Sequence, residues 1–169
     1  GKGEDDLLAA LEKIRDKIRY RHGRDYDRFR KKYDGVVEGF LKDLISSIKS
    51  YPLGEDIKED LIEQYEGYLE RKELPDSLAD AYPGRLKRKL KEAKEETKAL
   101  EENYEDQFDE AMQDYLDLLT KTANSVLKKG EVAKGKMFIL ENKVTTDNND
   151  RFEKIMDQEK VPLPGAPKK

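Results

Sequence analysis

Residues 85–128 read RLKRKLKEAKEETKALEENYEDQFDEAMQDYLDLLTKTANSVLK and contain neither glycine nor proline. Apolar and small residues recur along this segment at steps of three or four: Leu86, Leu90, Ala93, Thr97, Leu100, Tyr104, Phe108, Ala111, Tyr115, Leu119, Thr122 and Val126. This spacing keeps one narrow stripe on one side of an α-helix, as in an antiparallel coiled coil or a long helical hairpin. Such a helix would be roughly 65 Å long. We therefore expect an elongated, all-α protein.

The composition favours thin pairs of helices over a thick globular core. Apolar residues make up 36% of the 169 residues and charged residues 43%, whereas globular domains average about 45–50% and about 25%. Helices that bury only a stripe need fewer apolar residues. A disordered chain would be as polar, but it would lack both the sustained periodicity and the nine tyrosines and five phenylalanines.

The charge balance and the absence of cysteine exclude several classes of function. The 34 basic and 38 acidic residues give a net charge of −4, so nucleic acid is not the expected partner. No cysteine is present, which excludes disulfides and thiolate metal sites. No apolar run approaches the roughly 18 residues of a membrane span. The chain begins Gly1-Lys2-Gly3, which suggests a trimmed or processed product that would already have lost any export signal.

A second long helix is predicted near the start of the chain, beginning at about residues 4–6. Its stripe consists of Leu7, Leu11, Ile14, Ile18, His22, Tyr26, Phe29, Tyr33, Val37, Phe40, Leu44, Ile48 and Tyr51. Pro52-Leu53-Gly54 ends this helix, and a shorter helix then runs from Glu55 to about residues 72–74. Asp76-Ser77 is suited to cap a short helical turn that reaches Tyr82.

The last predicted helix begins near Glu131, after a turn at Gly130, and we expect its buried side to consist of Val132, Met137, Leu140 and Val144. The polar run 145–150 either lies within this helix, which we favour, or caps a new short helix. Phe152, Ile155 and Met156 resume the apolar pattern in both cases. Residues 161–169 contain three prolines, so we expect a flexible tail.

An internal repeat appears when the sequence is shifted by 75 residues. Tyr33, Phe40 and Leu44 then coincide with Phe108, Tyr115 and Leu119, and one extra residue also aligns the Gly54-Glu55 and Gly130-Glu131 turns. We therefore predict two tandem helical hairpins: residues 1–82 with a short connecting helix, and residues 83–160. The 161–169 tail follows. The second helix is too short to retrace the first, so the hairpins would form a staggered four-helix arrangement.

The second hairpin carries a resemblance to a known group of proteins. Tyr104, Phe108, Tyr115-Leu116 and Leu119 precede the turn Leu127-Lys128-Lys129-Gly130-Glu131-Val132, and Glu141 follows it. This pattern resembles the helical-hairpin segments of predicted exported proteins of planctomycete and verrucomicrobial bacteria. It covers about 40 residues, with Gly135 where those segments favour alanine. The resemblance implies an exported helical scaffold or interaction protein and supplies no catalytic residues.

Candidate catalytic and metal-binding residues are few. His22 is the only histidine, so the paired Glu-x-x-His motifs of di-iron bundles cannot be built. Carboxylates such as Asp106, Asp109 and Glu110 share a helix face, but acid–base work needs an enclosed pocket that separates their pKa values. We expect a solvated acidic face. We therefore predict that the chain is not an enzyme and has no catalytic, cofactor-binding or metal-binding residues.

The segment Arg15–Lys32 is basic, with nine basic residues against three acids. Such residues either bind an anionic membrane or nucleic acid, or pair with the acidic 101–117 segment within the molecule. The candidate contacts to an anion or partner are Arg19, Arg21, Arg24, Arg28, Arg85 and Arg88.

We expect a non-enzymatic helical scaffold or protein-interaction module, exported to the periplasm or the extracellular space, or otherwise cytoplasmic. A protein partner or a second copy would bind the thin stripe at the start of the 85–128 helix, formed by Leu86, Leu90, Ala93 and Leu100. The alternative function is binding to an anionic surface through residues 15–32, with peripheral membrane contact more plausible than nucleic acid.

Overall fold

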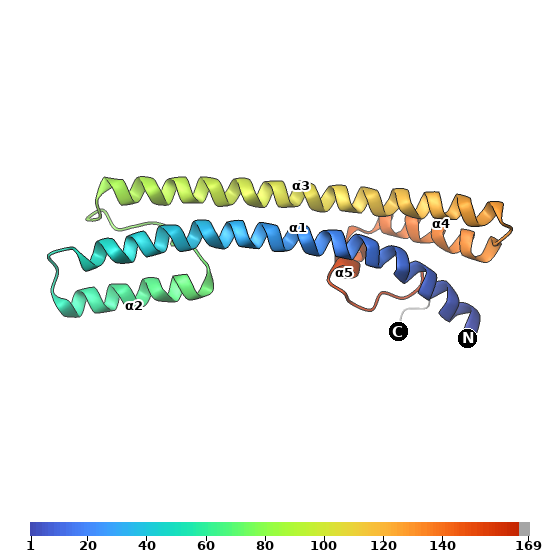
Figure 1. Cartoon of the computed structure of the whole chain (residues 1–169), viewed down its shortest axis with the longest axis horizontal. Helices are drawn as coiled ribbons and strands as arrows, with labels where there is room; N and C mark the ends of the chain where they lie inside the picture. Colours follow the sequence, from blue (N-terminus) through green and yellow to red (C-terminus); the bar gives the residue numbers. More distant parts are fainter. Residues whose placement is uncertain (166–169) are drawn as a thin grey trace. The chain divides into compact units, whose positions relative to one another are not determined.

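The computed structural model describes residues 1–165, which form five α-helices and no strand (Figure 1). The helices are α1 (Lys2–Lys49), α2 (Glu55–Arg71), α3 (Gly84–Lys128), α4 (Val132–Asp147) and α5 (Asn149–Met156). The predicted all-α class is confirmed. The two long segments with stripes at steps of three and four are each one unbroken helix, because nothing within them interrupts the backbone hydrogen bonds.

The chain divides into two compact units. Unit 1 comprises Gly1–Tyr26 and the chain from Glu105 onward, and unit 2 comprises Asp27–Tyr104. These units differ from the predicted division at residue 83, because α1 and α3 each contribute to both. Each unit contains one of the two expected hairpin turns together with the N-terminal part of the other long helix.

Unit 2 packs α2 against the C-terminal part of α1 and the N-terminal part of α3. The α2 helix folds back along α1 (Figure 1), and Lys72 Nζ lies 2.5 Å from Glu38 Oε1. Phe29 of α1 and Tyr104 of α3 have ring centroids 4.7 Å apart, so the two ends of unit 2 are neighbours. The buried core consists of Val37, Phe40, Leu41, Leu44, Ile45, Ile48, Tyr65, Leu78, Leu86, Leu90 and Ala93.

The short helical turn predicted after Asp76 is wrong, because residues 72–83 form a loop. The loop is held by its apolar side chains: Leu78 lies in the core of unit 2, and the Tyr82 hydroxyl donates to the Tyr65 hydroxyl at 3.3 Å. Burial of these two side chains takes precedence over the local capping signal.

Unit 1 is built from the N-terminal part of α1, the C-terminal part of α3, α4 and α5. The predicted turn at Gly130 is present, with a φ of +81° that favours glycine. After it α4 returns along α3, and the Asn142 amide donates to the Leu116 carbonyl at 2.8 Å. The buried core consists of Leu11, Ile14, Ile18, Ala111, Tyr115, Leu116, Leu119, Ala123, Met137, Phe138, Phe152, Ile155, Met156 and Val161.

The predicted buried side of α4 is right for Met137, which is buried, and wrong for Val132 and Leu140. Val132 and Leu140 are 51% and 38% exposed. The buried positions of α4 are Gly135, Met137, Phe138, Glu141 and Thr145. Gly135 explains part of this rotation, because a Cβ atom there would lie 2.3 Å from Leu127 Cδ2. The missing side chain lets this face of α4 approach α3.

The predicted continuation of α4 through residues 145–150 is also wrong. Asn148 adopts an extended conformation (φ −141°, ψ 99°), and its side-chain oxygen accepts a hydrogen bond from the Asp150 amide at 3.1 Å. This is the capped alternative. The break reorients the chain, so that Phe152, Ile155 and Met156 of α5 enter the core of unit 1.

The start of the predicted flexible tail is ordered. Val161 is buried in the core of unit 1, and Leu163 packs against that core. Residues 166–169 lie outside the described residues. The proline content suggested mobility, but these two apolar side chains and the Val161 and Pro162 carbonyl groups hold the segment.

We expect Asn148→Ala to lower the free energy of unfolding by about 1 kcal/mol, because the first turn of α5 loses its side-chain acceptor. Urea unfolding followed by circular dichroism would measure the change. Asn149→Ala is the matched control, since no cap is lost there, and its effect should stay within about 0.5 kcal/mol. Equal losses in both variants would contradict the capping role.

Candidate functional site

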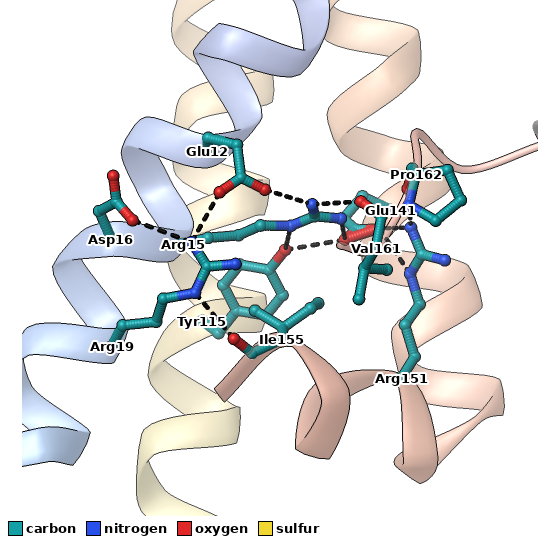
Figure 2. Close-up of polar contacts among 10 residues, drawn as sticks. All are labelled: Glu12, Arg15, Asp16, Arg19, Tyr115, Glu141, Arg151, Ile155, Val161 and Pro162. Atoms are coloured by element: carbon teal, nitrogen blue, oxygen red, sulfur yellow. Dashed lines mark hydrogen bonds and ion pairs between the residues drawn. The ribbon is translucent and has the colours of Figure 1, made fainter. Parts of the chain in front are cut away.

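A buried cluster of charged side chains lies in unit 1, and Glu141 of α4 is at its centre (Figure 2). Its carboxylate accepts hydrogen bonds from Arg15 Nη2 of α1 at 3.1 Å and from the Tyr115 hydroxyl of α3 at 2.8 Å. Arg151 of α5 donates through Nε at 2.8 Å. Four helices therefore meet at one carboxylate.

The segment after α5 completes the cluster. The Val161 carbonyl accepts from Arg15 Nη1 at 2.7 Å, and the Pro162 carbonyl accepts from Arg151 Nη2 at 2.9 Å. These bonds satisfy guanidinium donors that the Glu141 carboxylate leaves unused. We call Val161–Gly165 the C-terminal strap, because its first two residues bind the two arginines of the cluster.

A second carboxylate borders the cluster on α1. Glu12 accepts from Arg15 Nη1 at 2.7 Å and from Arg19 Nη1 at 2.6 Å. Arg19 also donates to Asp16 at 2.9 Å and to the Ile155 carbonyl at 2.7 Å. Partial burial by itself would raise the pKa of Glu12, but the hydrogen bonds from the two arginines hold it below its usual value.

The surroundings of the cluster keep Arg15 charged and Tyr115 protonated. Burial alone would lower the pKa of Arg15, but Tyr115 and Glu141 beside it raise the pKa above its usual value. The pKa of the Tyr115 hydroxyl is raised strongly, first by burial and then by the Glu141 carboxylate. Both side chains, like Glu141, are fully buried. The arrangement is therefore an ion-pair network that holds helices together.

Catalysis would need a reactive side chain that faces a cavity. A groove of about 780 Å³ runs beside the network between α1 and the strap, and of the network side chains only Glu12, Asp16 and Arg19 line it. Glu141 and Tyr115 do not line this groove, and the donors around Glu141 occupy both of its oxygens. Among the described residues, no group of three or more acids or histidines could hold a metal ion.

The six predicted arginines divide between the two units: three belong to unit 1 (Arg19, Arg21 and Arg24) and three to unit 2 (Arg28, Arg85 and Arg88). Arg19 belongs to the network, while Arg21 pairs with Asp114 and, at 3.3 Å, with Glu110 of the acidic segment. Arg85 pairs with Asp43 at 3.3 Å. The Arg24 guanidinium lies 6.0 Å from the centre of the Tyr20 ring. The remaining two, Arg28 and Arg88, are exposed in unit 2.

The predicted partner-binding stripe on α3 is not open to a partner. Leu86, Leu90 and Ala93 are buried in the core of unit 2, because α1 and α2 cover them. Leu100 is half-buried and lines a shallow groove. Most of the stripe is therefore already packed against α1 and α2 of the same chain.

The outer face of α4 carries exposed apolar side chains that the sequence analysis placed inside or did not use. Val132, Ile139 and Leu140 are 51%, 52% and 38% exposed, and Lys136 and Lys143 lie between and beyond them. These five residues, the α4 outer face, point away from the packed side of the helix formed by Phe138, Glu141 and Thr145.

His22 has a packing role in unit 1. Its ring meets Phe108 edge-on, with centroids 5.4 Å apart and an interplanar angle of 77°. Burial lowers its pKa, although Asp25 and Asp157 act in the opposite direction. The neutral imidazole therefore prevails near pH 7, which suits an aromatic contact.

No protein-family model, curated protein or solved structure matches this chain. Its class is that of an all-α protein built from long helices and helical hairpins. None of the helices within residues 1–165 combines the length and the apolar character that a membrane span requires.

The network was missed by sequence reasoning, although one signal was present. Arg15 falls between Leu11 and Ile18 at steps of four and three, so it continues the apolar stripe. Glu141 likewise lies three residues after Phe138. Opposite charges at two stripe positions of different helices indicate a buried pair. The sequence had placed Arg15 only in the basic segment 15–32, which either binds an anionic surface or pairs with the acidic 101–117 segment.

We expect Glu141→Ala to lower the free energy of unfolding by about 3–5 kcal/mol, because it removes the buried carboxylate shared by Arg15 and Arg151 and leaves Arg15 only the partly exposed Glu12. Denaturant unfolding measures the loss. Asp114→Ala is the matched control: it also removes a carboxylate from an arginine, but at a site that is 42% exposed, so its cost should stay below about 1 kcal/mol. Similar losses would show that the network does not stabilise the fold.

A tyrosine titration tests the electrostatics. Burial first raises the pKa values of Tyr33, Tyr65 and Tyr115. The native protein keeps these protons at a pH where the unfolded chain has lost them, so the stability is complete below about pH 10 and falls as the pH rises further. Ultraviolet absorbance should show that these three tyrosines ionise at a higher pH in the native protein than in the unfolded chain. Tyr115→Phe should reduce the alkaline loss; an unchanged profile would contradict the assignment.

Proposed function

We propose that the chain is a non-enzymatic helical scaffold that binds another protein through the α4 outer face. The observation that carries this proposal is the exposure of Val132 and Ile139, each about half exposed, on a helix whose other side is fully packed. The described charged groups with the deepest burial, Arg15 and Glu141, are already committed to each other. The expected export from a bacterial cell belongs to the same proposal.

The spacing on α4 suits a partner helix. Val132 and Ile139 are seven residues apart, which places them two turns apart on one line along the helix. A helix with apolar residues on every side is normally buried on every side. On α4 that second layer of burial would come from a partner.

Lys136 and Lys143 define the chemistry of that partner. Both are exposed beside the apolar side chains, so a partner surface with carboxylates around an apolar centre would complement them. A second copy placed with its own α4 against this face would bring four lysines together. The charges therefore favour a different protein.

Site-specific photo-cross-linking in the cells that make the protein tests the proposal. A photoreactive residue at Ile139 should form a discrete cross-link to one protein, and the same residue at Gln113, exposed on α3, should not. The captured protein, purified, should bind the wild type with micromolar affinity and at least tenfold more weakly after Val132→Ser and Ile139→Ser.

These two substitutions should change the free energy of unfolding by less than about 0.5 kcal/mol, because both side chains are largely exposed. Cross-linking at Ile139 no stronger than at Gln113 would overturn the proposed function. So would equal binding of the captured protein to the wild type and to the double variant.

A further inference from the structure

The junction between α4 and α5 in unit 1 is a single residue. The α4 helix ends at Asp147 and α5 begins at Asn149, with the extended Asn148 between them. Residues 145–150 contain neither glycine nor proline, and residues 146–150 are exposed. The sequence therefore permits a straight helix through the junction. The bend depends on contacts that the chain after the junction makes with the rest of unit 1.

We call residues 149–165, which comprise α5 and the strap, the C-terminal arm. Its buried apolar side chains, which pack in the core of unit 1 with residues of α1, α3 and α4, are Phe152, Ile155, Met156 and Val161. The arm is also held by polar contacts (Figure 2): Arg151 Nε donates to Glu141 at 2.8 Å, and the Val161 carbonyl accepts from Arg15 at 2.7 Å. These contacts join the arm to residues that precede the junction. The arm of a second copy could therefore make them unchanged.

A one-residue junction leaves backbone groups without partners inside either helix. The first N–H groups of α5 and the last C=O groups of α4 lack intrahelical acceptors and donors. One of these amides, that of Asp150, is bound by the Asn148 side chain at 3.1 Å. A straight helix would supply backbone partners instead, but it would carry Phe152 away from the core of its own chain. Short hinges of this kind favour the exchange of a segment between copies.

The polar contacts specify which segment can replace the arm. Arg151 of the arm brings a positive charge to the buried Glu141 carboxylate, and the strap brings a carbonyl to the buried Arg15. An unrelated apolar peptide would leave Glu141 with one arginine fewer and Arg15 with an unused donor, and unmade hydrogen bonds of buried groups are costly. A second copy of the same arm meets both requirements.

We propose that two copies of this chain exchange their C-terminal arms. In each copy α4 and α5 join into one straight helix, and the arm packs in the core of the other copy through the contacts described above. The association is reciprocal, because each copy gives one arm and accepts one. The dimer carries two α4 outer faces, so a partner with two matching sites would bind it more tightly than a monomer. The exchange itself uses other contacts and goes beyond the proposed function.

Refolding at high protein concentration tests the exchange. The wild type, unfolded in urea and refolded at about 1 mM, should give a dimer that gel filtration separates from the monomer. Asn148→Ala should lower the dissociation constant of the dimer at least about tenfold, because the bent monomer loses its cap and the straight helix does not need one. A Gly-Gly-Gly insertion after Asn148 interrupts a straight helix and lengthens the hinge, so it should leave only the monomer.

Asn124→Ala is the matched control for the hinge. It makes the same substitution at an exposed position within α3, far along the chain from the junction. It should leave the dissociation constant of the dimer unchanged within about twofold. Circular dichroism checks that each variant keeps the helix content of the wild type.

Cross-linking between two different chains shows whether the arms are exchanged. The chain contains no cysteine, and Tyr20 of α1 and Gln158 of the arm line the same groove. A Tyr20→Cys variant and a tagged Gln158→Cys variant, refolded together and treated with a bis-maleimide, should give a covalent heterodimer on a denaturing gel. The same two variants, refolded separately as monomers and then mixed, should give none.

A wild type and an Asn148→Ala variant that are both monomeric after refolding at about 1 mM would overturn the exchange. A dimer that gives no heterodimer cross-link would also overturn it, because the copies would then be joined through another surface. Equal effects of Asn124→Ala and Asn148→Ala would contradict the role of the hinge. The photo-cross-link at Ile139 does not depend on the arm, so the proposed function stands or fails separately.

Discussion

Unit 1 depends on the requirement that the buried Glu141 carboxylate be neutralised. An uncompensated charge at that depth costs several kcal/mol, so Arg15 and Arg151 must reach it from two other helices. This fixes the rotation of α4 and the placement of α5. It also fixes the path of the C-terminal strap, whose carbonyls take the arginine donors that remain. Among the described residues of unit 2 no charged side chain is buried. There an apolar core with one buried threonine, Thr97, holds the helices together.

The network also explains how long helices with repetitive stripes find one register. A slip of α1 along α3 by seven residues would keep apolar residues facing each other, so the stripe alone tolerates several registers. Such a slip would move Arg15 about 10 Å from Glu141 and break the one ion pair of the network that joins α1 to α4. The charged cluster therefore specifies alignment, while the stripe supplies most of the apolar burial. The buried polar groups therefore select one register among the several that the apolar stripe alone would allow.

The helices could be predicted from the sequence, but the face of α4 that is buried could not. The stripes on α1 and α3 and the turn at Gly130 follow from local spacing and backbone freedom, so they could be predicted. On α4, apolar residues occur all round, and Val132 looked as suitable for burial as Phe138. Only the distant Arg15 decides that Glu141 points inward. The break at Asn148 and the ordered Val161 likewise depend on contacts with other helices, which no local pattern contains. The absence of an open stripe at Leu86 has the same cause.

The way α1 and α3 are shared between the units has a consequence for biosynthesis. Unit 2 is one continuous piece of chain whose ends, near Phe29 and Tyr104, touch. All of its residues have been synthesised while the partners of the first 26 residues are still unmade. Its folding then brings the two halves of unit 1 together and removes the entropy of closing a long loop. Folding of the middle of the chain in this way assists the folding of its two ends.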